Sequence, residues 1–341
     1  MRDRLIKACR RQRTDTRPIW LMRQAGRYLP EYRKIRERYD VMTICRTPEL
    51  AAMVSSLPVE LFEVDAAVIF ADIMLPLESL GVRFRLEDGV GPVVADRISS
   101  LDQVRSLSSF EPSRLSFVFD AIKETRRLLN DSVPVIGFSG GPFTLASYLI
   151  EGGPSRDFAR TKGVMFGRGR VWTELMERLS EMASAYLQGQ ARAGAKVLQL
   201  FDSWVGSLNE AEYREYVLPY SRAVIRKASE TGVPLIHFGV DTAAILECMA
   251  EAGGDVIGVD WRVNIDEAWR RVGHDRGIQG NLDPAVLLSE TATIRRHAED
   301  VLRRTAGFPG HIFNLGHGVL PNTPPENVKE LVEYVHVKGA T

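Results

Sequence analysis

Residues 18–27 read Pro18-Ile19-Trp20-Leu21-Met22-Arg23-Gln24-Ala25-Gly26-Arg27. The run 19–22 is short, apolar and rich in strand-forming residues, and it ends abruptly in arginine and small residues. We therefore predict a strand that delivers Arg23 and Arg27 to a loop at its carboxyl end, where Ala25 and Gly26 let a ligand approach closely. Two arginines at this spacing suit two-point binding of carboxylate or phosphate. An equally good interpretation is a pair of arginines bound to acids of the chain itself.

Short apolar runs recur along the chain, and helix-favouring segments separate them. The runs are residues 19–22, 66–70, 133–138, 196–201, 234–238, 256–260, 277–280 and 311–315. The helix-favouring segments include residues 48–63, 170–193, 210–231, 242–252 and 291–305. Most runs do not alternate with polar residues, which is typical of parallel strands buried on both faces.

Eight strands alternating with helices predict an α/β protein with a (β/α)8 TIM barrel in a single domain over residues 1–341. A doubly wound open sheet is the alternative, and it is disfavoured because no Gly-x-Gly-x-x-Gly follows the first run. Residues 1–16 are predicted to form a basic helical extension. Residues 81–94 alternate around Asp88-Gly89, which predicts a β-hairpin inserted outside the barrel.

Composition limits the kind of partner. The 341-residue chain is 45% hydrophobic and has a formal net charge of zero, which describes an ordinary globular protein with no general attraction for nucleic acid. The charge is uneven, because residues 1–40 hold thirteen lysines and arginines against five acids, a surplus of eight. A local surplus in a neutral chain favours an anionic small molecule as the ligand.

Localisation follows from what the sequence lacks. No apolar run approaches the roughly 20 residues that span a bilayer, and the N-terminus has no signal-peptide core. Cys9, Cys45 and Cys248 lie far apart, which suits a reducing compartment. We therefore expect a cytoplasmic enzyme with no membrane partner.

In a (β/α)8 barrel, the loops at the carboxyl ends of the strands carry the active site. In this chain those positions supply three arginines, several acids and a group of neutral hydrogen-bonding side chains. They are Arg23, Arg27, Asp72, Tyr148, Glu151, Asp202, Ser203, His237, Asp241, Asp260, Arg262, Gln279, Asn281, Asn314 and His317.

Several of these stretches carry a resemblance to a known family. They are Met22-Arg23-Gln24-Ala25-Gly26-Arg27-Tyr28-Leu29-Pro30-Glu31-Tyr32, Phe70-Ala71-Asp72-Ile73, Gly137-Phe138-Ser139-Gly140-Gly141-Pro142-Phe143-Thr144-Leu145, Leu198-Gln199-Leu200-Phe201-Asp202-Ser203, Gln279-Gly280-Asn281-Leu282-Asp283-Pro284 and Asn314-Leu315-Gly316-His317-Gly318. With them the chain resembles the uroporphyrinogen decarboxylase family from about residue 4 to residue 337. The resemblance implies a (β/α)8 barrel, a decarboxylation without cofactor or metal, a place in porphyrin and haem biosynthesis, and a homodimer.

The resemblance also implies which residues bind the substrate, a cyclic tetrapyrrole with acetate and propionate arms. By this resemblance the contacts are Arg23, Gln24, Ala25, Gly26, Arg27, Asp72, Tyr148, Ser203 and His317. Asp72 is the residue held to carry the chemistry, with Arg23 and Arg27 beside it. Taken without the family, Tyr148 fits a core position and Asp72 fits a helix cap.

Losing carbon dioxide from an acetate arm requires an electron sink, and a pyrrole protonated at its α-carbon provides one. A single carboxylate such as Asp72 can accept hydrogen bonds from pyrrole N–H groups and stabilise the resulting cation. Arg23 and Arg27 suit the peripheral carboxylates. An arginine pKa of about 12.5 makes arginine an awkward acid, so the proton donor stays open, with a bound water and a substrate carboxyl as rivals.

Two other functions compete with this interpretation. Zinc-dependent methyltransferases acting on corrinoids or thiols share a related barrel, but they need a His-x-Cys pair and a distant cysteine. Here His237 is followed by Phe238 and Gly239, and Cys248 comes eleven residues after the histidine. A non-catalytic tetrapyrrole-binding protein is the second rival, and it has less need of the central Asp72 than of the arginines at the rim.

Overall fold

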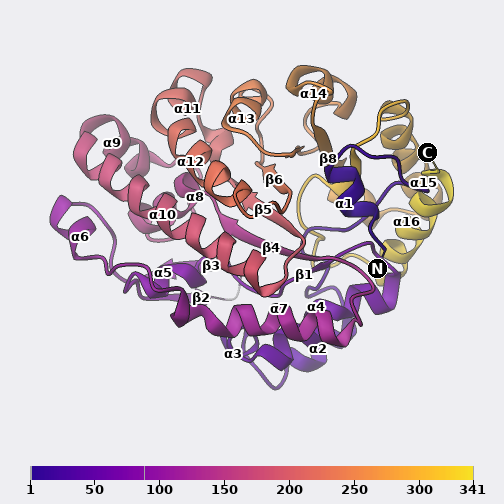
Figure 1. Ribbon diagram of the computed structural model, residues 1–341, viewed down its shortest axis with the longest axis horizontal. Coiled ribbons are helices and arrows are strands. Elements are labelled where there is room, and N and C mark those ends of the chain that lie inside the picture. Colours follow the sequence, from indigo (N-terminus) through magenta and orange to yellow (C-terminus); the bar gives the residue numbers. More distant parts are fainter. Residues whose placement is uncertain (1, 88, 341) are drawn as a thin grey trace.

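The computed structural model describes residues 2–87 and 89–340. Within them the main sheet has seven parallel strands in the order β1-β4-β5-β6-β7-β8-β9. The strands are β1 (Ala67–Val68), β4 (Val135–Gly140), β5 (Val197–Phe201), β6 (Leu235–Phe238), β7 (Val256–Gly258), β8 (Gly277–Leu282) and β9 (His311–Leu315). Neighbouring parallel strands need crossover connections, and Figure 1 shows the helices that provide them lying outside the strands.

From β4 onward, α-helices separate the successive strands of the main sheet, as the alternating pattern predicts. The α-helices are α1 (Arg4–Cys9), α2 (Pro30–Arg36), α3 (Val41–Arg46), α4 (Pro48–Phe62), α5 (Leu75–Ser79), α6 (Leu101–Ser106), α7 (Ser116–Leu128), α8 (Pro142–Glu151), α9 (Ala159–Gly167), α10 (Gly169–Ala193), α11 (Glu210–Tyr216), α12 (Leu218–Ser229), α13 (Leu246–Ala252), α14 (Ile265–Val272), α15 (Thr291–Arg304) and α16 (Pro325–Lys338). Short 3₁₀ helices are η1 (Pro112–Leu115), η2 (Val205–Ser207) and η3 (Pro284–Leu288).

The prediction of a strand at residues 19–22 is wrong. In the part of the chain that the structure describes, this segment forms an isolated parallel bridge between Ile19 and Phe313 of β9. It nevertheless lies between the two edges of the sheet. The Phe313 N–H donates to the Pro18 carbonyl at 2.8 Å, and the Asp65 N–H, just before β1, donates to the Ile19 carbonyl at 2.8 Å. Pro18 has no N–H of its own, so a regular ladder does not start there.

Helix α1 closes the barrel at the amino ends of the strands. Its Leu5, Ala8 and Cys9 are buried in one cluster with inward-facing strand residues such as Ile136. A Cβ placed on Gly277, the first residue of β8, would lie 3.5 Å from the Ala8 carbonyl oxygen. The predicted basic extension therefore has an apolar face that packs against the strands and covers the amino-terminal end of the barrel.

The predicted hairpin is confirmed as β2 (Phe84–Glu87) paired antiparallel with β3 (Gly91–Val94); Asp88 of its predicted turn lies outside the described residues. The predicted helix 210–231 is wrong in being continuous, because it breaks at Val217, whose φ is −128°. Pro219 follows two residues later and has no N–H for a helical bond. The chain therefore restarts as α12.

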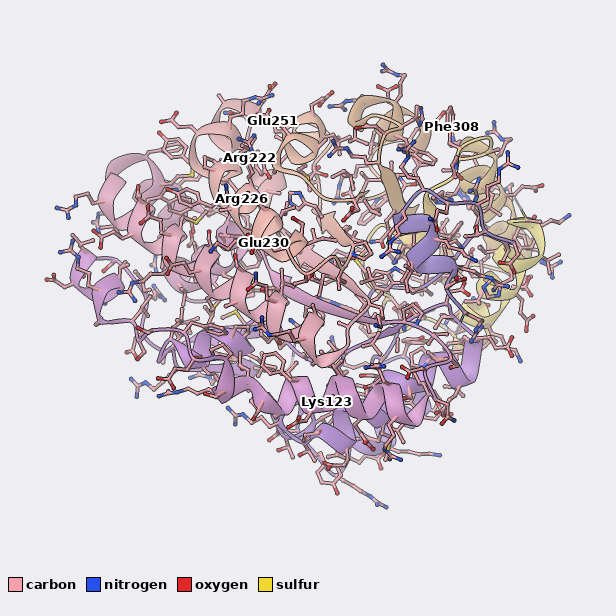
Figure 2. All side chains as sticks on the ribbon, viewed as in Figure 1. Lys123, Arg222, Arg226, Glu230, Glu251 and Phe308 are labelled. Carbon is pink, nitrogen blue, oxygen red and sulfur yellow. The ribbon has the colours of Figure 1, made fainter. Side chains whose placement is uncertain are left out.

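The outer helices carry most of the charge. Figure 2 labels Arg222 and Glu251 on neighbouring elements of this surface, and their side chains pair at 2.8 Å. Both are almost half exposed, so such a pair contributes at most about 1 kcal/mol. Among residues 2–87 and 89–340, we find no helix whose length and apolar content would let it cross a membrane.

Candidate active site

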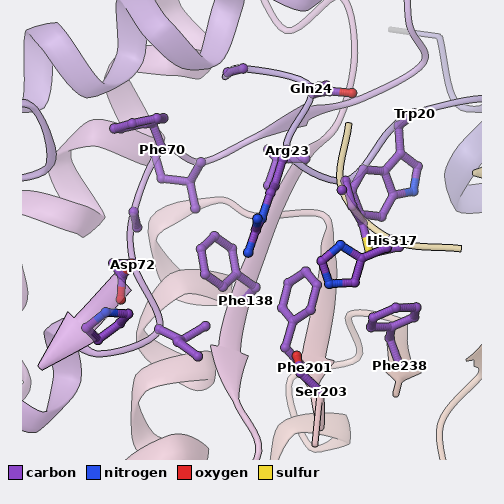
Figure 3. Close-up of a pocket in the computed structure, with 18 of the residues that line it drawn as sticks. Trp20, Arg23, Gln24, Phe70, Asp72, Phe138, Phe201, Ser203, Phe238 and His317 are labelled. Carbon is purple, nitrogen blue, oxygen red and sulfur yellow. The ribbon is translucent and has the colours of Figure 1, made fainter. Parts of the chain in front are cut away.

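A cavity of about 280 Å³ opens at the carboxyl ends of the strands. Its wall combines two side chains of opposite charge with a broad apolar surface (Figure 3). The lining residues are Trp20, Met22, Arg23, Gln24, Ala25, Val68, Ile69, Phe70, Ala71, Asp72, Ile73, Pro92, Phe138, Tyr148, Phe201, Ser203, Phe238, His317 and Gly318. Seven of the nine sequence-predicted site residues are among them.

Arg23 occupies the middle of this cavity. Figure 3 shows its side chain extending between Asp72 on one side and His317 on the other. The residue has a left-handed backbone, with φ of 57°, which turns the chain sharply after the segment 18–22. Its side chain passes so close to Gly318 that a Cβ there would lie 2.7 Å from Arg23 Cγ. Among the described residues Arg23 has no ion-pair partner, so its guanidinium is available to a ligand.

Asp72 is half-buried in the turn that follows β1. One carboxylate oxygen, Oδ1, accepts a hydrogen bond from the Met74 N–H at 2.8 Å within the turn before α5. Asp72 is not the cap of that helix, because the N-cap position is Met74 and no side chain bonds there. Burial raises the pKa of Asp72, while the Met74 N–H and the charge of Arg23 act in the opposite direction. This bond uses one oxygen and leaves the other for a ligand in the cavity.

Tyr148, Ser203 and His317 reach the cavity from three different elements. Tyr148 comes from α8 and packs against Trp204 with ring centroids 4.1 Å apart. Burial and the nearby charge of Asp72 raise the pKa of its hydroxyl, so it stays protonated as a donor. Burial, Arg23 and Arg262 lower the pKa of His317 to about 4, so the imidazole is neutral at pH 7.

Only the first part of the loop formed by residues 23–27 lines the cavity. Gly26 and Arg27 are absent from the lining. Gly26 serves the turn, because a Cβ there would lie 2.9 Å from the Arg23 carbonyl oxygen. Arg27 is exposed, and Arg33 holds its backbone by donating to the Arg27 carbonyl at 3.0 Å. Gln24 borders the cavity, but it is 2% exposed.

The apolar wall was missed by reasoning from the sequence. Phe201 and Phe238 are the last residues of β5 and β6, and their rings meet at 5.8 Å in an edge-to-face arrangement. Their position at the strand ends was the available signal, but apolar residues there follow the same pattern as the buried core. Pro92 was missed because the hairpin was placed outside the barrel, whereas the structure brings β3 to the cavity wall.

Other acids at the strand ends do not line the cavity. Asp202 is fully buried and accepts a hydrogen bond from Ser221 at 2.9 Å, with His237 Nε2 at 3.4 Å. Asp260 is bound to the Arg262 guanidinium. Asp72 is thus the carboxylate that the described part of the chain presents to the cavity.

Comparison with known proteins identifies the family. The family model for uroporphyrinogen decarboxylase matches residues 1–337. The chain belongs to the uroporphyrinogen decarboxylase family. Uroporphyrinogen decarboxylase from Solibacter usitatus is 48% identical over 98% of this chain and 97% of its own. The corresponding protein from Thermobifida fusca is 51% identical over 98% of this chain and 92% of its own. Membership in this family makes the chain an enzyme, a decarboxylase.

Solved structures support the barrel. A methyltransferase from Methanosarcina mazei superposes with a TM-score of 0.81 over 98% of this chain and 97% of its own, at 21% sequence identity. At that identity the likeness shows a shared fold, and it confirms the predicted α/β barrel class. In the described residues of this uroporphyrinogen decarboxylase family member, no three His, Cys, Asp or Glu side chains gather as a metal site would require. Cys248 is buried on α13, as expected of a core residue.

Proposed function

We propose that the chain removes carbon dioxide from the acetate side chains of uroporphyrinogen III, leaving methyl groups and giving coproporphyrinogen III in porphyrin and haem biosynthesis. One observation carries this proposal: Asp72 and Arg23 are the two oppositely charged side chains of a single, otherwise largely apolar cavity. A carboxylate in such a setting suits a cationic intermediate, and a guanidinium suits a carboxylate arm.

Asp72 stabilises positive charge on the pyrrole. Its cavity-facing oxygen accepts hydrogen bonds from pyrrole N–H groups when the α-carbon is protonated. The electron pair of the breaking carbon–carbon bond then enters the cationic ring, and carbon dioxide leaves. A second proton on the exposed methylene completes the methyl group, and the ring returns the first proton.

Arg23 holds a peripheral carboxylate by a charge-assisted hydrogen bond. Arg27, outside the cavity, meets arms that extend past its mouth, and Ala25 and Gly26 give the loop its close approach to them. Tyr148 and Ser203 donate hydrogen bonds to carboxylates. His317, neutral at pH 7 because its pKa is about 4, binds an arm without acting as an imidazolium acid.

The proton donor is not an arginine under this proposal. The pKa of a guanidinium is about 12.5 or higher, far above the pH of a cell. His317 is unprotonated at that pH as well. A water molecule in the cavity or a carboxyl of the substrate therefore delivers the proton.

The decisive experiment incubates the purified protein with uroporphyrinogen III under reducing conditions and separates the products by chromatography. We expect intermediates with seven, six and five carboxylates and then coproporphyrinogen III. The reaction is repeated after exhaustive chelation, where we expect unchanged rates because the pyrrole is its own electron sink. Activity lost on chelation and restored by zinc would favour methyltransferase-like chemistry. Tight binding without product would favour a tetrapyrrole carrier.

We also propose a two-fold homodimer in the cytoplasm. A cavity at the barrel mouth gains cover from a second copy, and closed two-fold symmetry is the commonest assembly. Sedimentation at micromolar concentration is expected to give twice the mass of the 38.1 kDa chain. A fully active species at the monomer mass would exclude the dimer.

A further inference from the structure

The segment that carries Arg23 is held in an unusual way. Regular strands bond their backbone N–H groups to backbone carbonyls of their neighbours. In residues 19–22 only the Trp20 N–H donates to a backbone carbonyl, that of Phe313, at a long distance of 3.4 Å. The N–H groups of Ile19, Leu21 and Met22 donate to side chains instead.

Gln24 makes two of the bonds that replace the ladder. Its Oε1 accepts from the Leu21 N–H at 3.0 Å, and its Nε2 donates to the Ala66 carbonyl at 2.9 Å. One amide therefore ties the segment to the residue before β1. Figure 3 shows this amide directed away from the Arg23 guanidinium. At 2% exposure it is occupied with the backbone rather than offered to a ligand.

Asn314 of β9 holds the segment from the other side. Its Oδ1 accepts from the Met22 N–H at 3.1 Å and from its own neighbour, Leu315, at 2.8 Å. The side chain is fully buried. Asp65 completes the set, because its Oδ2 accepts from the Ile19 N–H at 2.9 Å.

Arg23 depends on these bonds more than an ordinary strand residue would. It follows Met22 directly, and its left-handed backbone costs on the order of 1 kcal/mol, which neighbouring contacts must offset. The Gln24 and Asn314 side chains fix the backbone at Leu21 and Met22, directly before this turn. Gln24 itself follows the turn and is tied to Ala66. We propose that Gln24 and Asn314 are positioning residues that hold Arg23 in its orientation in the cavity. This inference rests on the proposed function, since it assumes that Arg23 binds the substrate.

The test is a double-mutant cycle between Gln24→Met and Arg23→Lys. Methionine has nearly the length of glutamine but cannot make either hydrogen bond. In the wild-type background we expect Gln24→Met to lower kcat/KM for uroporphyrinogen about ten-fold or more, because a misplacement near 1 Å has effects of this size. In the Arg23→Lys background the same substitution should change kcat/KM less than two-fold, because residues that act through one another are not additive.

Gln190→Met is the matched control. Gln190 is equally buried and makes the same pair of bonds, accepting from the Phe138 N–H at 2.9 Å and donating to the Phe138 carbonyl at 2.8 Å. Its target, β4, is held independently by strands on both sides. Gln190→Met should therefore lower the melting temperature with kcat/KM within two-fold of wild type.

The cycle distinguishes a failure of the inference from a failure of the proposed function. Equal fractional losses of kcat/KM from Gln24→Met in both backgrounds would overturn the inference, and so would wild-type kinetics in Gln24→Met. Unchanged kinetics in Arg23→Lys alone would instead refute the proposed role of Arg23. If Gln24→Met does not fold, Asn314→Leu enters the same cycle, and additivity there counts against the inference in the same way.

Discussion

Gly318 offers a direct way to move Arg23 without altering its charge. The glycine follows His317 at the cavity wall, and the Arg23 side chain lies across its Cα. A Cβ added here would lie 2.7 Å from Arg23 Cγ and 3.0 Å from Arg23 Cβ, and closer still to Arg23 Cδ. Gly318 has no left-handed backbone, so alanine introduces crowding without backbone strain.

The size of the effect follows from these distances. Carbon atoms pack comfortably at about 3.5–4.0 Å, so Gly318→Ala requires the Arg23 stem to retreat by about 1 Å. The stem cannot yield only at its flexible tip, because the crowded atoms begin at Cβ. A displacement of about 1 Å at a substrate-positioning group costs up to about 100-fold in rate, which corresponds to about 2.7 kcal/mol of transition-state stabilisation.

The measurement is kcat/KM for uroporphyrinogen, with melting temperature recorded in parallel. We expect a loss between about ten-fold and 100-fold in Gly318→Ala, with the fold intact. Gly163→Ala on α9 is the control, because nothing lies within 4 Å of a Cβ at that position. It should leave kinetics unchanged and slightly raise stability, since alanine favours helices over glycine. Wild-type kinetics in a well-folded Gly318→Ala enzyme would refute the placement of Arg23.

Three further predictions concern ionisable side chains in and near the cavity. Arg23→Lys should lower kcat/KM by roughly ten- to 100-fold through loss of the planar fork, and Arg27→Lys by less, because Arg27 lies outside the cavity. Equal losses in the two variants would contradict this difference between them. Asp72→Asn should lower turnover by about 100- to 1000-fold and yet stabilise the free protein against urea at pH 7. Because the pKa of Asp72 is higher in the folded protein than in the unfolded chain, the folded protein loses stability as pH rises from the unfolded pKa through the folded pKa. Asparagine does not ionise, so Asp72→Asn does not lose this stability. A variant less stable than wild type at pH 7 would contradict this reasoning. The stability of His317→Gln should rise relative to that of wild type as pH falls from about 6.5 to about 4. In this range His317 binds a proton in the unfolded chain but not in the folded protein, where its pKa is lowered, so only the wild-type protein loses stability. Urea titrations at several pH values measure this difference, and a constant gap between the two proteins would disprove it.

The sequence predicted the regular part of the barrel because burial on both faces imposes an apolar pattern. The runs at residues 133–138 and 196–201 became β4 and β5 with shifts of at most two residues at either end. The run 19–22 is also apolar, yet it does not form a ladder. Three of its four backbone N–H groups donate to the side chains of Gln24, Asn314 and Asp65. A side-chain acceptor, whether it is near in sequence like Gln24 or distant like Asn314, leaves no periodic signal in the apolar pattern.

The candidate site was only partly readable from the sequence. Family motifs placed Asp72, Tyr148 and His317 in one cavity, although the three lie far apart along the chain. The motif contains both Arg23 and Arg27, but it does not reveal that only Arg23 points into the cavity. The direction of each side chain depends on the backbone angles of the turn between them, which the sequence does not show. Apolar residues of the wall could not be distinguished from core residues by composition alone.

The electrostatics of the cavity suggest why these two charges belong together. Burial makes the ionised form of Asp72 unfavourable in the free enzyme, and the Arg23 charge offsets only part of that cost. Under the proposed function, a substrate carboxylate binds Arg23. The Arg23 charge is then shared with a new anion, and the Asp72 carboxylate is left with less compensation than before. A positive charge that develops on the pyrrole restores it. The Asp72 carboxylate therefore interacts more strongly with the cationic intermediate than with the neutral pyrrole. An interaction that becomes stronger along the reaction is the kind that accelerates it. Under the proposed function, the apolar wall of phenylalanines contributes to catalysis by keeping water from screening this change.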